Sequence, residues 1–209
     1  MNIKYIFVYS LFSCVYSIKY IRYSMIRPLY IDLYNKIGQE KYYTLEHVVP
    51  KCYYKEYTHL VKDMHNILLY PSNINLHRSN YKYVNEDRYY NQLTILDNQG
   101  NIVKKKNQIL DLAIKNNKMK TFIPPNKYKG AIARSCMYFI NQYPRFESVI
   151  INKVIDPKIL LLWHYAYPVT EFEMEKNEVI KSIQGNENIY VTKPIKLFYD
   201  MNDWYNLRV

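Results

Sequence analysis

The pattern of apolar and polar residues predicts two short strands followed by a helix in the first half of the chain. Residues 41–49 are aromatic or β-branched at many positions and stop at Pro50, which favours a strand. A second apolar run at 67–70 favours another strand. Ser72 or Asn73 can cap the start of a helix after it. The predicted order is therefore strand, loop, strand, helix.

The last third of the chain has the periodicity of helices. Apolar residues recur at three- and four-residue steps over 130–140, which predicts one helix. Asp156 can cap a second helix, with Pro157 in its first turn. Thr170 and Glu173 have the spacing of a capping box for a third helix, which we expect to end at Gly185.

The remaining segments are shorter and more polar. Residues 27–40 predict a short helix or turn region after Pro28, and 97–101 predict a hairpin turn. A strand is expected at 121–123, and strand or loop over the tail 186–209. These elements predict an α+β fold with a small antiparallel sheet and several packed helices.

The length of 209 residues suits a single domain, which we expect to span 18–209. Residues 1–17 combine a short basic start with an apolar stretch, so a signal peptide is favoured over an N-terminal strand or an uncleaved anchor. Basic residues directly after this stretch argue against a simple secretory signal. The expected location is secreted or exported, and the alternatives are membrane anchorage through the first segment or an intracellular location.

Composition adds a basic charge and three cysteines. The net charge is +11, which favours nucleic acid or an anionic membrane as the partner, unless the lysines serve only solubility. The spacing of Cys14, Cys52 and Cys136 excludes a Cys-x-x-Cys metal site. Cys52 and Cys136 either pair in an exported protein or remain buried thiols.

Four residues suggest a hydrolytic site for phosphodiesters. His47 can take a proton from water near neutral pH, and its neighbour Glu46 offers a hard oxygen of the kind that Mg²⁺ prefers. Asn75 offers a neutral oxygen, and Arg78 lies one helical turn further on, where its guanidinium can hold a phosphate. The alternatives are a structural histidine, a helix-capping asparagine and a surface ion pair.

One geometric difficulty accompanies this site. Neighbouring residues of a regular strand point to opposite faces, so Glu46 and His47 can serve one site only if the strand ends or distorts there. Other polar residues are less specific. Asp63, His65 and Asn66 predict structural or supporting contacts, and a buried Arg134 predicts either a core ion pair or a phosphate contact.

Six motifs follow one another over residues 41–194. They are LEHVVP at 45–50, DMHN at 63–66, NxxRSN at 75–80, KGAIAR at 129–134, LW at 162–163 with PV at 168–169, and IQGNEN at 183–188. In this order the motifs resemble those of the bacterial endonuclease I family, whose members are secreted or periplasmic, sequence-nonspecific nucleases of the His-Me finger (ββα-metal) class. The chain departs from the family pattern at Ala131, Phe172 and 189–190, away from the proposed catalytic residues.

The resemblance implies a role for each candidate. His47 matches the general base, Glu46 and Asn75 match the ligands of a single Mg²⁺ (with Mn²⁺ or Ca²⁺ as substitutes), and Arg78 matches a position of phosphate or structural support. It implies a monomeric, Mg²⁺-dependent endonuclease that hydrolyses DNA, with RNA as a second substrate, and leaves 5′-phosphates. The alternative is a catalytically inactive, basic nucleic-acid-binding protein of the same fold, which would require the loss of a residue of this set.

Overall fold

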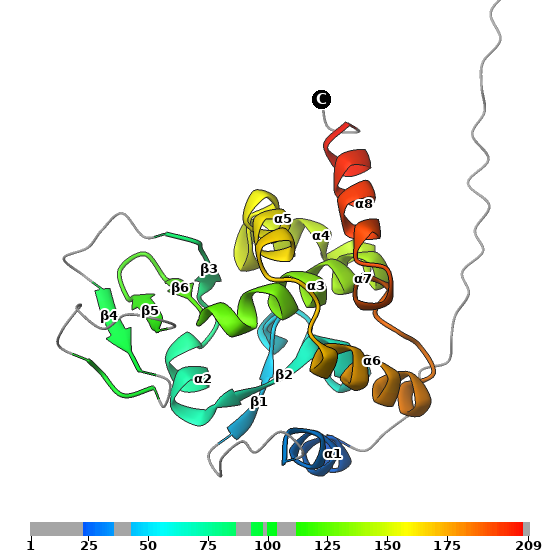
Figure 1. The fold of residues 1–209 in the computed structure, drawn as a ribbon. Helices are drawn as coiled ribbons and strands as arrows, with labels where there is room; N and C mark the ends of the chain where they lie inside the picture. The colour runs from blue at the N-terminus through cyan, green and yellow to red at the C-terminus, as the bar shows by residue number, and fades with distance from the viewer. Residues whose placement is uncertain (1–22, 36–42, 87–92, 98–99, 104–111, 207–209) are drawn as a thin grey trace, which may run out of the picture.

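The computed structural model describes residues 23–35, 43–86, 93–97, 100–103 and 112–206. Its helices are α1 (Tyr23–Asn35), α2 (Ser72–Arg78), α3 (Asn126–Gln142), α4 (Glu147–Val149), α5 (Pro157–Ala166), α6 (Glu171–Gln184), α7 (Ile189–Thr192) and α8 (Ile195–Asn206). Its strands are β1 (Tyr43–His47), β2 (Ile67–Pro71), β3 (Lys82–Tyr83), β4 (Leu93–Leu96), β5 (Ala113–Asn116) and β6 (Thr121–Ile123). The α+β class is confirmed (Figure 1).

The strands form two separate sheets. β1 and β2 form an antiparallel ribbon in which His47 lies opposite Ile67, and α2 follows β2 directly. The predicted order of strand, strand and helix is therefore confirmed. The second sheet has the order β3–β6–β5–β4, and its β3–β6 pair is parallel. Figure 1 shows this sheet at one end of the molecule, with α3 running from it toward α7.

The β1–β2 ribbon lies between two apolar clusters. All five residues of β2 are buried, and their side chains alternate between the clusters. Leu68 and Tyr70 belong to the larger cluster, which includes most of the buried face of α3. Ile67 and Leu69 belong to the smaller cluster with residues of α1 and α6. This alternation is the two-residue period of a strand with both faces covered.

The helix α3 approaches the connection between α5 and α6 very closely at Gly130. A Cβ atom placed on Gly130 would lie 2.2 Å from the carbonyl oxygen of Tyr167 and 2.6 Å from Nη2 of Arg134. Only glycine fits this contact, which explains a residue that is otherwise unfavourable inside a helix.

The predicted helix ends at 156–157, 170–173 and 185 are confirmed. Oδ1 of Asp156 accepts a hydrogen bond from N of Lys158 at 2.8 Å, and Oγ1 of Thr170 accepts one from N of Glu173 at 3.2 Å. Gly185 ends α6 with a left-handed φ of 90°. The carboxylate of Glu173 contacts Arg134, so only half of the expected capping box forms.

The start of α2 corrects one prediction. Pro71 occupies the N-cap position, and no side chain there donates or accepts a capping hydrogen bond. Ser72 and Asn73 are the first residues of the helix instead of its caps. Because Pro71 still belongs to β2, the strand runs into the helix without a linker.

The tail also corrects a prediction, because the structure has α7 and α8 where the sequence predicts strand or loop over 186–209. Oδ1 of Asn188 caps α7 by accepting a hydrogen bond from N of Tyr190 at 3.0 Å. Leu197 and Met201 are buried one turn apart on α8. The helical pattern is thus present but short, and it depends on packing against α5 and α7.

The first helix begins earlier than predicted. α1 starts at Tyr23, and Pro28 lies inside it. Ile26 and Tyr30 are buried one turn apart, so the apolar face of α1 extends across the proline. The predicted reversal at 97–101 and the strand β6 are confirmed.

Cys52 is exposed and Cys136 is buried, and both are free thiols, so they do not pair with each other. Within the described ranges, the helices are too short or too polar to cross a membrane. The segment 1–17 lies outside the described residues, and the single domain at 18–209 stays a prediction.

Asp63 connects the loop between β1 and β2 to two distant helices. Its carboxylate is fully buried and accepts hydrogen bonds from Oη of Tyr138 at 3.0 Å, Oη of Tyr143 at 2.7 Å and Nε2 of Gln184 at 2.9 Å. It also accepts one from N of His65 at 3.0 Å. The loop is therefore fixed by side chains of α3 and α6 and not by a sheet.

We expect Asp63→Ala to lower the free energy of unfolding by about 3 kcal/mol or more, because it leaves several buried donors without an acceptor. Asp156→Ala is the control, since it removes only the cap of α5 and should lower the free energy by about 1 kcal/mol. Urea unfolding followed by circular dichroism measures both. Equal losses in the two variants would contradict the structural role of Asp63.

Candidate functional site

The four candidate residues meet where β1 ends against α2. Glu46 and His47 are the last residues of β1, and Asn75 and Arg78 lie one turn apart on α2. Nδ2 of Asn75 and the guanidinium of Arg78 both contact β1 or the residue that follows it. The structure thus brings the predicted set together at one place.

Arg78 is buried, with an exposed fraction of 1%. Its Nη1 lies 2.7 Å from Oε1 of Glu46 and donates to the carbonyl of His47 at 3.1 Å, while Nη2 donates to the carbonyl of Val48 at 2.6 Å. Its guanidinium also lies 4.5 Å from the ring centre of Tyr83. In this arrangement Arg78 supports the backbone of the site, and its guanidinium does not lie on the surface where a phosphate would approach.

The strand ends directly after His47. This is the break that Glu46 and His47 need if two neighbouring residues are to face one site. The chain bends at Val48 and Val49. N of Val48 donates to the carbonyl of Asn66 at 2.9 Å, and N of Val49 donates to Oδ1 of Asn66 at 2.8 Å. The buried amide side chain of Asn66 therefore accepts the hydrogen bond of N of Val49, which has no strand partner after the bend.

The hydrogen bond of His47 determines which ring nitrogen can accept a proton. Nε2 lies 2.9 Å from the carbonyl oxygen of Val61. A carbonyl can only accept, so Nε2 carries the proton and the lone pair of the neutral ring is on Nδ1. Burial lowers the pKa of His47 to about 4, so the ring is neutral at pH 7 and can accept a proton.

Burial raises the pKa of Glu46 to about 7, although the neighbouring Arg78 and Lys51 lower it. Oε1 of Glu46 is buried and has no hydrogen bond from the described residues, because its close contact with Nη1 of Arg78 lacks hydrogen-bond geometry. A buried carboxylate oxygen with unused acceptor capacity is what a metal ligand provides.

The amide of Asn75 has a defined orientation. It lies 3.0 Å from Oγ1 of Thr44 and 3.2 Å from the carbonyl oxygen of Leu45. A carbonyl must face a donor, so the nitrogen of the amide points to β1 and its oxygen points away from it. A carboxylate and an amide oxygen are hard ligands that fit a divalent ion such as Mg²⁺, which keeps several waters and needs few protein ligands.

The other polar residues noted in the sequence are structural. Nε2 of His65 contacts the carbonyl of Asn186 at 3.1 Å, and Nδ2 of Asn66 donates to Oη of Tyr54 at 2.8 Å. Nε and Nη2 of Arg134 each donate to one carboxylate oxygen of Glu173 at 2.6 Å. Of the two alternatives for Arg134, the structure has the buried ion pair. Across the described ranges, His, Cys, Asp and Glu do not gather in threes that could hold a metal.

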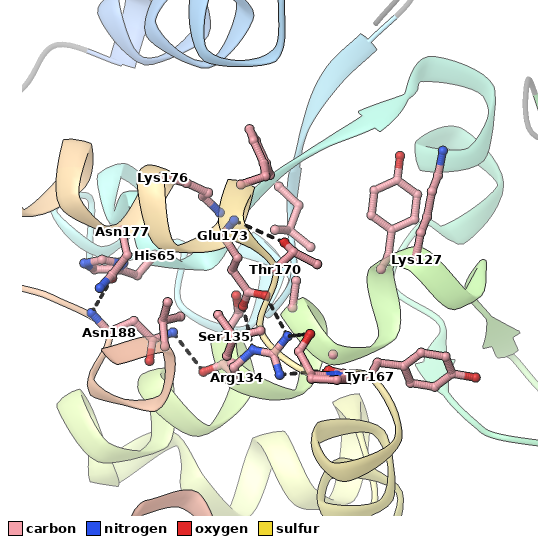
Figure 2. Close-up of a pocket in the computed structure, with 18 of the residues that line it drawn as sticks. His65, Lys127, Arg134, Ser135, Tyr167, Thr170, Glu173, Lys176, Asn177 and Asn188 are labelled. Carbon is pink, nitrogen blue, oxygen red and sulfur yellow. Dashed lines mark hydrogen bonds and ion pairs between the residues drawn. The ribbon is translucent and has the colours of Figure 1, made fainter. Parts of the chain in front are cut away.

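A cavity of about 510 Å³ lies apart from these four residues, between α3, α6 and the connection before α6 (Figure 2). Its wall includes His65 and Arg134, and also Lys176 and Asn177, which the sequence analysis does not single out. Both lie on α6, four and three residues before the buried Ile180, and this helical spacing is the signal that could have indicated their burial.

Known proteins are similar to this chain over most of its length. The family model described as Endonuclease I matches residues 12–195. An Endonuclease-1 of Buchnera aphidicola subsp. Acyrthosiphon pisum (strain APS) is 32% identical over 139 residues, which are 66% of this chain and 48% of the relative. The Endonuclease-1 of Buchnera aphidicola subsp. Baizongia pistaciae (strain Bp) is 30% identical over 138 residues, which are 65% of this chain and 48% of the relative.

A protein named as an extracellular deoxyribonuclease, from Aeromonas hydrophila, is 25% identical over 141 residues, which are 66% of this chain and 52% of that protein. The chain therefore spans about half of the length of these curated relatives.

Replacing Arg78 tests whether it supports the fold or only contacts substrate. We expect Arg78→Ala to lower the free energy of unfolding by about 3–5 kcal/mol without metal or nucleic acid, because it leaves Glu46 without its buried ion-pair partner and two carbonyls without their donor. The exposed Arg145, which stacks on Tyr57, is the control, and Arg145→Ala should lower it by less than about 1 kcal/mol. Urea unfolding measures both. An unchanged stability of Arg78→Ala would contradict the supporting role.

Proposed function

Because the chain belongs to the endonuclease I family, we propose that it is an endonuclease that hydrolyses phosphodiester bonds of nucleic acid. The observation that carries the proposal is the end of β1. There the hydrogen bond to Val61 fixes His47 as a neutral ring with its lone pair on Nδ1, next to the acidic Glu46 and the helix that carries Asn75.

The proposed reaction uses His47 as a general base. Nδ1 takes a proton from a water molecule while the oxygen of that water attacks phosphorus. The bond from phosphorus to the 3′-oxygen breaks, the 3′-oxygen takes a proton from solvent, and the product keeps a 5′-phosphate. The low pKa of His47 keeps the base unprotonated across the physiological range. Arg78 acts through His47, whose carbonyl it holds in place.

Glu46 and Asn75 are the residues proposed to hold a divalent metal, with Mg²⁺ the first choice and Mn²⁺ or Ca²⁺ as substitutes. When bound, such an ion supplies stabilisation of the negative charge that develops on the phosphate and the leaving oxygen. The buried Oε1 of Glu46 without a hydrogen bond, and the outward amide oxygen of Asn75, support this assignment.

The proposed substrate is DNA, with RNA as a second candidate, and the proposed recognition is of the phosphate backbone regardless of sequence. The net charge of +11 supports an anionic polymer as the partner. Lys51 is exposed in the short 3₁₀ helix that follows the end of β1, and its positive charge lowers the pKa of both Glu46 and His47. This charge next to the site also supports an anionic substrate. A monomer stays a prediction.

An inactive nucleic-acid-binding protein of the same fold is a weaker candidate. It would require the loss of one of Glu46, His47 and Asn75, and the sequence has all three. Export also belongs to the proposal, because one relative is named as an extracellular deoxyribonuclease.

We expect His47→Ala to reduce cleavage of plasmid DNA by about 10²-fold or more, because the reaction then lacks its base, while DNA binding stays nearly unchanged. His59→Ala, on an exposed histidine, should leave cleavage unchanged. EDTA should stop cleavage by the unaltered protein, and added Mg²⁺ should restore it. Wild-type rates in purified His47→Ala, or full activity in EDTA, would refute this mechanism.

We expect binding of Mg²⁺ to weaken as the pH falls below 7, because a proton and the metal compete for Glu46. The same raised pKa means that the contribution of Glu46 to metal-free stability is present below pH 4.5 and is lost as the pH rises through 7. Mg²⁺ should therefore raise the midpoint of thermal unfolding at pH 8 much more than at pH 6.

Asn75→Ala should remove most of that Mg²⁺-dependent shift while keeping Glu46. The control is Glu187→Gln, which changes a partly exposed carboxylate paired with Lys181. A Mg²⁺ shift that is equal at both pH values, or equal in Asn75→Ala and wild type, would contradict the proposed ligands.

A further inference from the structure

The cavity between α3 and α6 is large enough for a small organic molecule and is separate from the residues proposed for cleavage. Its volume of about 510 Å³ falls in the range of small-molecule sites. Figure 2 shows Asn177 and His65 at one end and Lys127 and Tyr167 at the other, with Lys176 and Glu173 between them. Leu68, on β2, also lines it.

Asn177 lines this cavity and carries a buried donor. Its exposed fraction is 2%, and its Oδ1 accepts a hydrogen bond from N of Asn188 at 2.8 Å. That bond fixes the orientation of the amide. Nδ2 is then buried without an acceptor among the residues that the structure describes. A buried donor of this kind in a well-packed helix calls for a partner from outside the chain.

Lys176, next to Asn177 on α6, adds a buried positive charge. Its Nζ donates to the carbonyl of Ile67 at 2.8 Å and lies 5.2 Å from the ring centre of Tyr30. An ammonium has three donors, so this carbonyl does not exhaust it. Burial lowers the pKa of Lys176 to about 8, yet the group remains mostly charged at pH 7.

The neighbouring carboxylate does not neutralise this charge by direct pairing. Both oxygens of Glu173 accept short hydrogen bonds from Arg134, at 2.6 Å each. The donors at the cavity with capacity to spare are therefore Nζ of Lys176 and Nδ2 of Asn177. Most of the remaining wall is apolar, with Leu68, Phe172 and Ile180 among its residues.

We propose that this cavity binds a small monocarboxylate with an apolar body. The carboxylate accepts from Nδ2 of Asn177 and from Nζ of Lys176, and the hydrocarbon part packs against the apolar wall. Such a ligand satisfies the buried donor, pairs the buried charge and fills the apolar volume. The site does not depend on nuclease activity, so the two proposals can fail separately.

Isothermal titration of the whole protein with sodium octanoate tests this site, with 1-octanol as the uncharged probe of matched length. We expect saturable binding of one octanoate per chain and at least about tenfold weaker binding of octanol, since a good charged hydrogen bond is worth that much. Lys176→Met and Asn177→Leu should each weaken octanoate binding by about tenfold or more. Lys181→Met, on the exposed face of α6, is the control and should bind as wild type does.

Ala131→Phe provides a test that keeps both donors, because Ala131 lines the cavity and a larger side chain fills its volume. It should abolish octanoate binding while the circular dichroism spectrum stays unchanged. No saturable binding at millimolar octanoate would overturn the proposal. So would equal binding of octanol, or unchanged binding in folded Ala131→Phe, and the cavity would then hold water only.

Discussion

The buried guanidinium of Arg78 joins the two elements on which the candidate site depends. From α2 it reaches the carboxylate of Glu46 and the two carbonyls where β1 ends. Asn66 satisfies the amides of the same bend from the opposite side of the loop. The backbone groups at the end of the strand are thus hydrogen-bonded by the side chain of Arg78 and by the side chain and carbonyl of Asn66. This allows the strand to end sharply while these backbone groups stay paired. Because β1 ends here, Glu46 and His47 can contribute to one site although they are neighbours in the strand.

The loop between β1 and β2 is held by long-range contacts of the same polar kind. Asp63 and Gln184 are 121 residues apart in the chain, yet their side chains hydrogen-bond in the core. The carbonyl of Val61, which orients the ring of His47, belongs to this loop. The position of the proton on that ring therefore depends on how α3 and α6 pack around Asp63. The proposed chemistry and the stability of the helical half are therefore physically connected.

Local patterns predicted much of this structure. The strand order, the caps at Asp156 and Thr170 and the end of α6 at Gly185 rest on a few adjacent residues, and each is confirmed. The ordered motifs also indicated the family correctly. The short helices of the tail and the burial of Arg78 and Lys176 depend on what packs against them. From sequence alone, an arginine or lysine on an amphipathic helix is predicted to be exposed to solvent, because its burial depends on elements that are distant in the chain. The roles of Glu46, His47 and Asn75 stay predictions.

The ribbon of β1 and β2 has a further consequence for how such a chain can vary in length. The residues of β2 alternate between two apolar clusters, so a shift of one position would move the side chains of each cluster to the other cluster. The same shift would carry Glu46 to the face away from Arg78. A change of one residue in the length of either strand would therefore separate Glu46 and His47 from α2. The loop between the strands can change in length only away from Val61, Asp63 and Asn66, whose contacts hold the end of β1 in place.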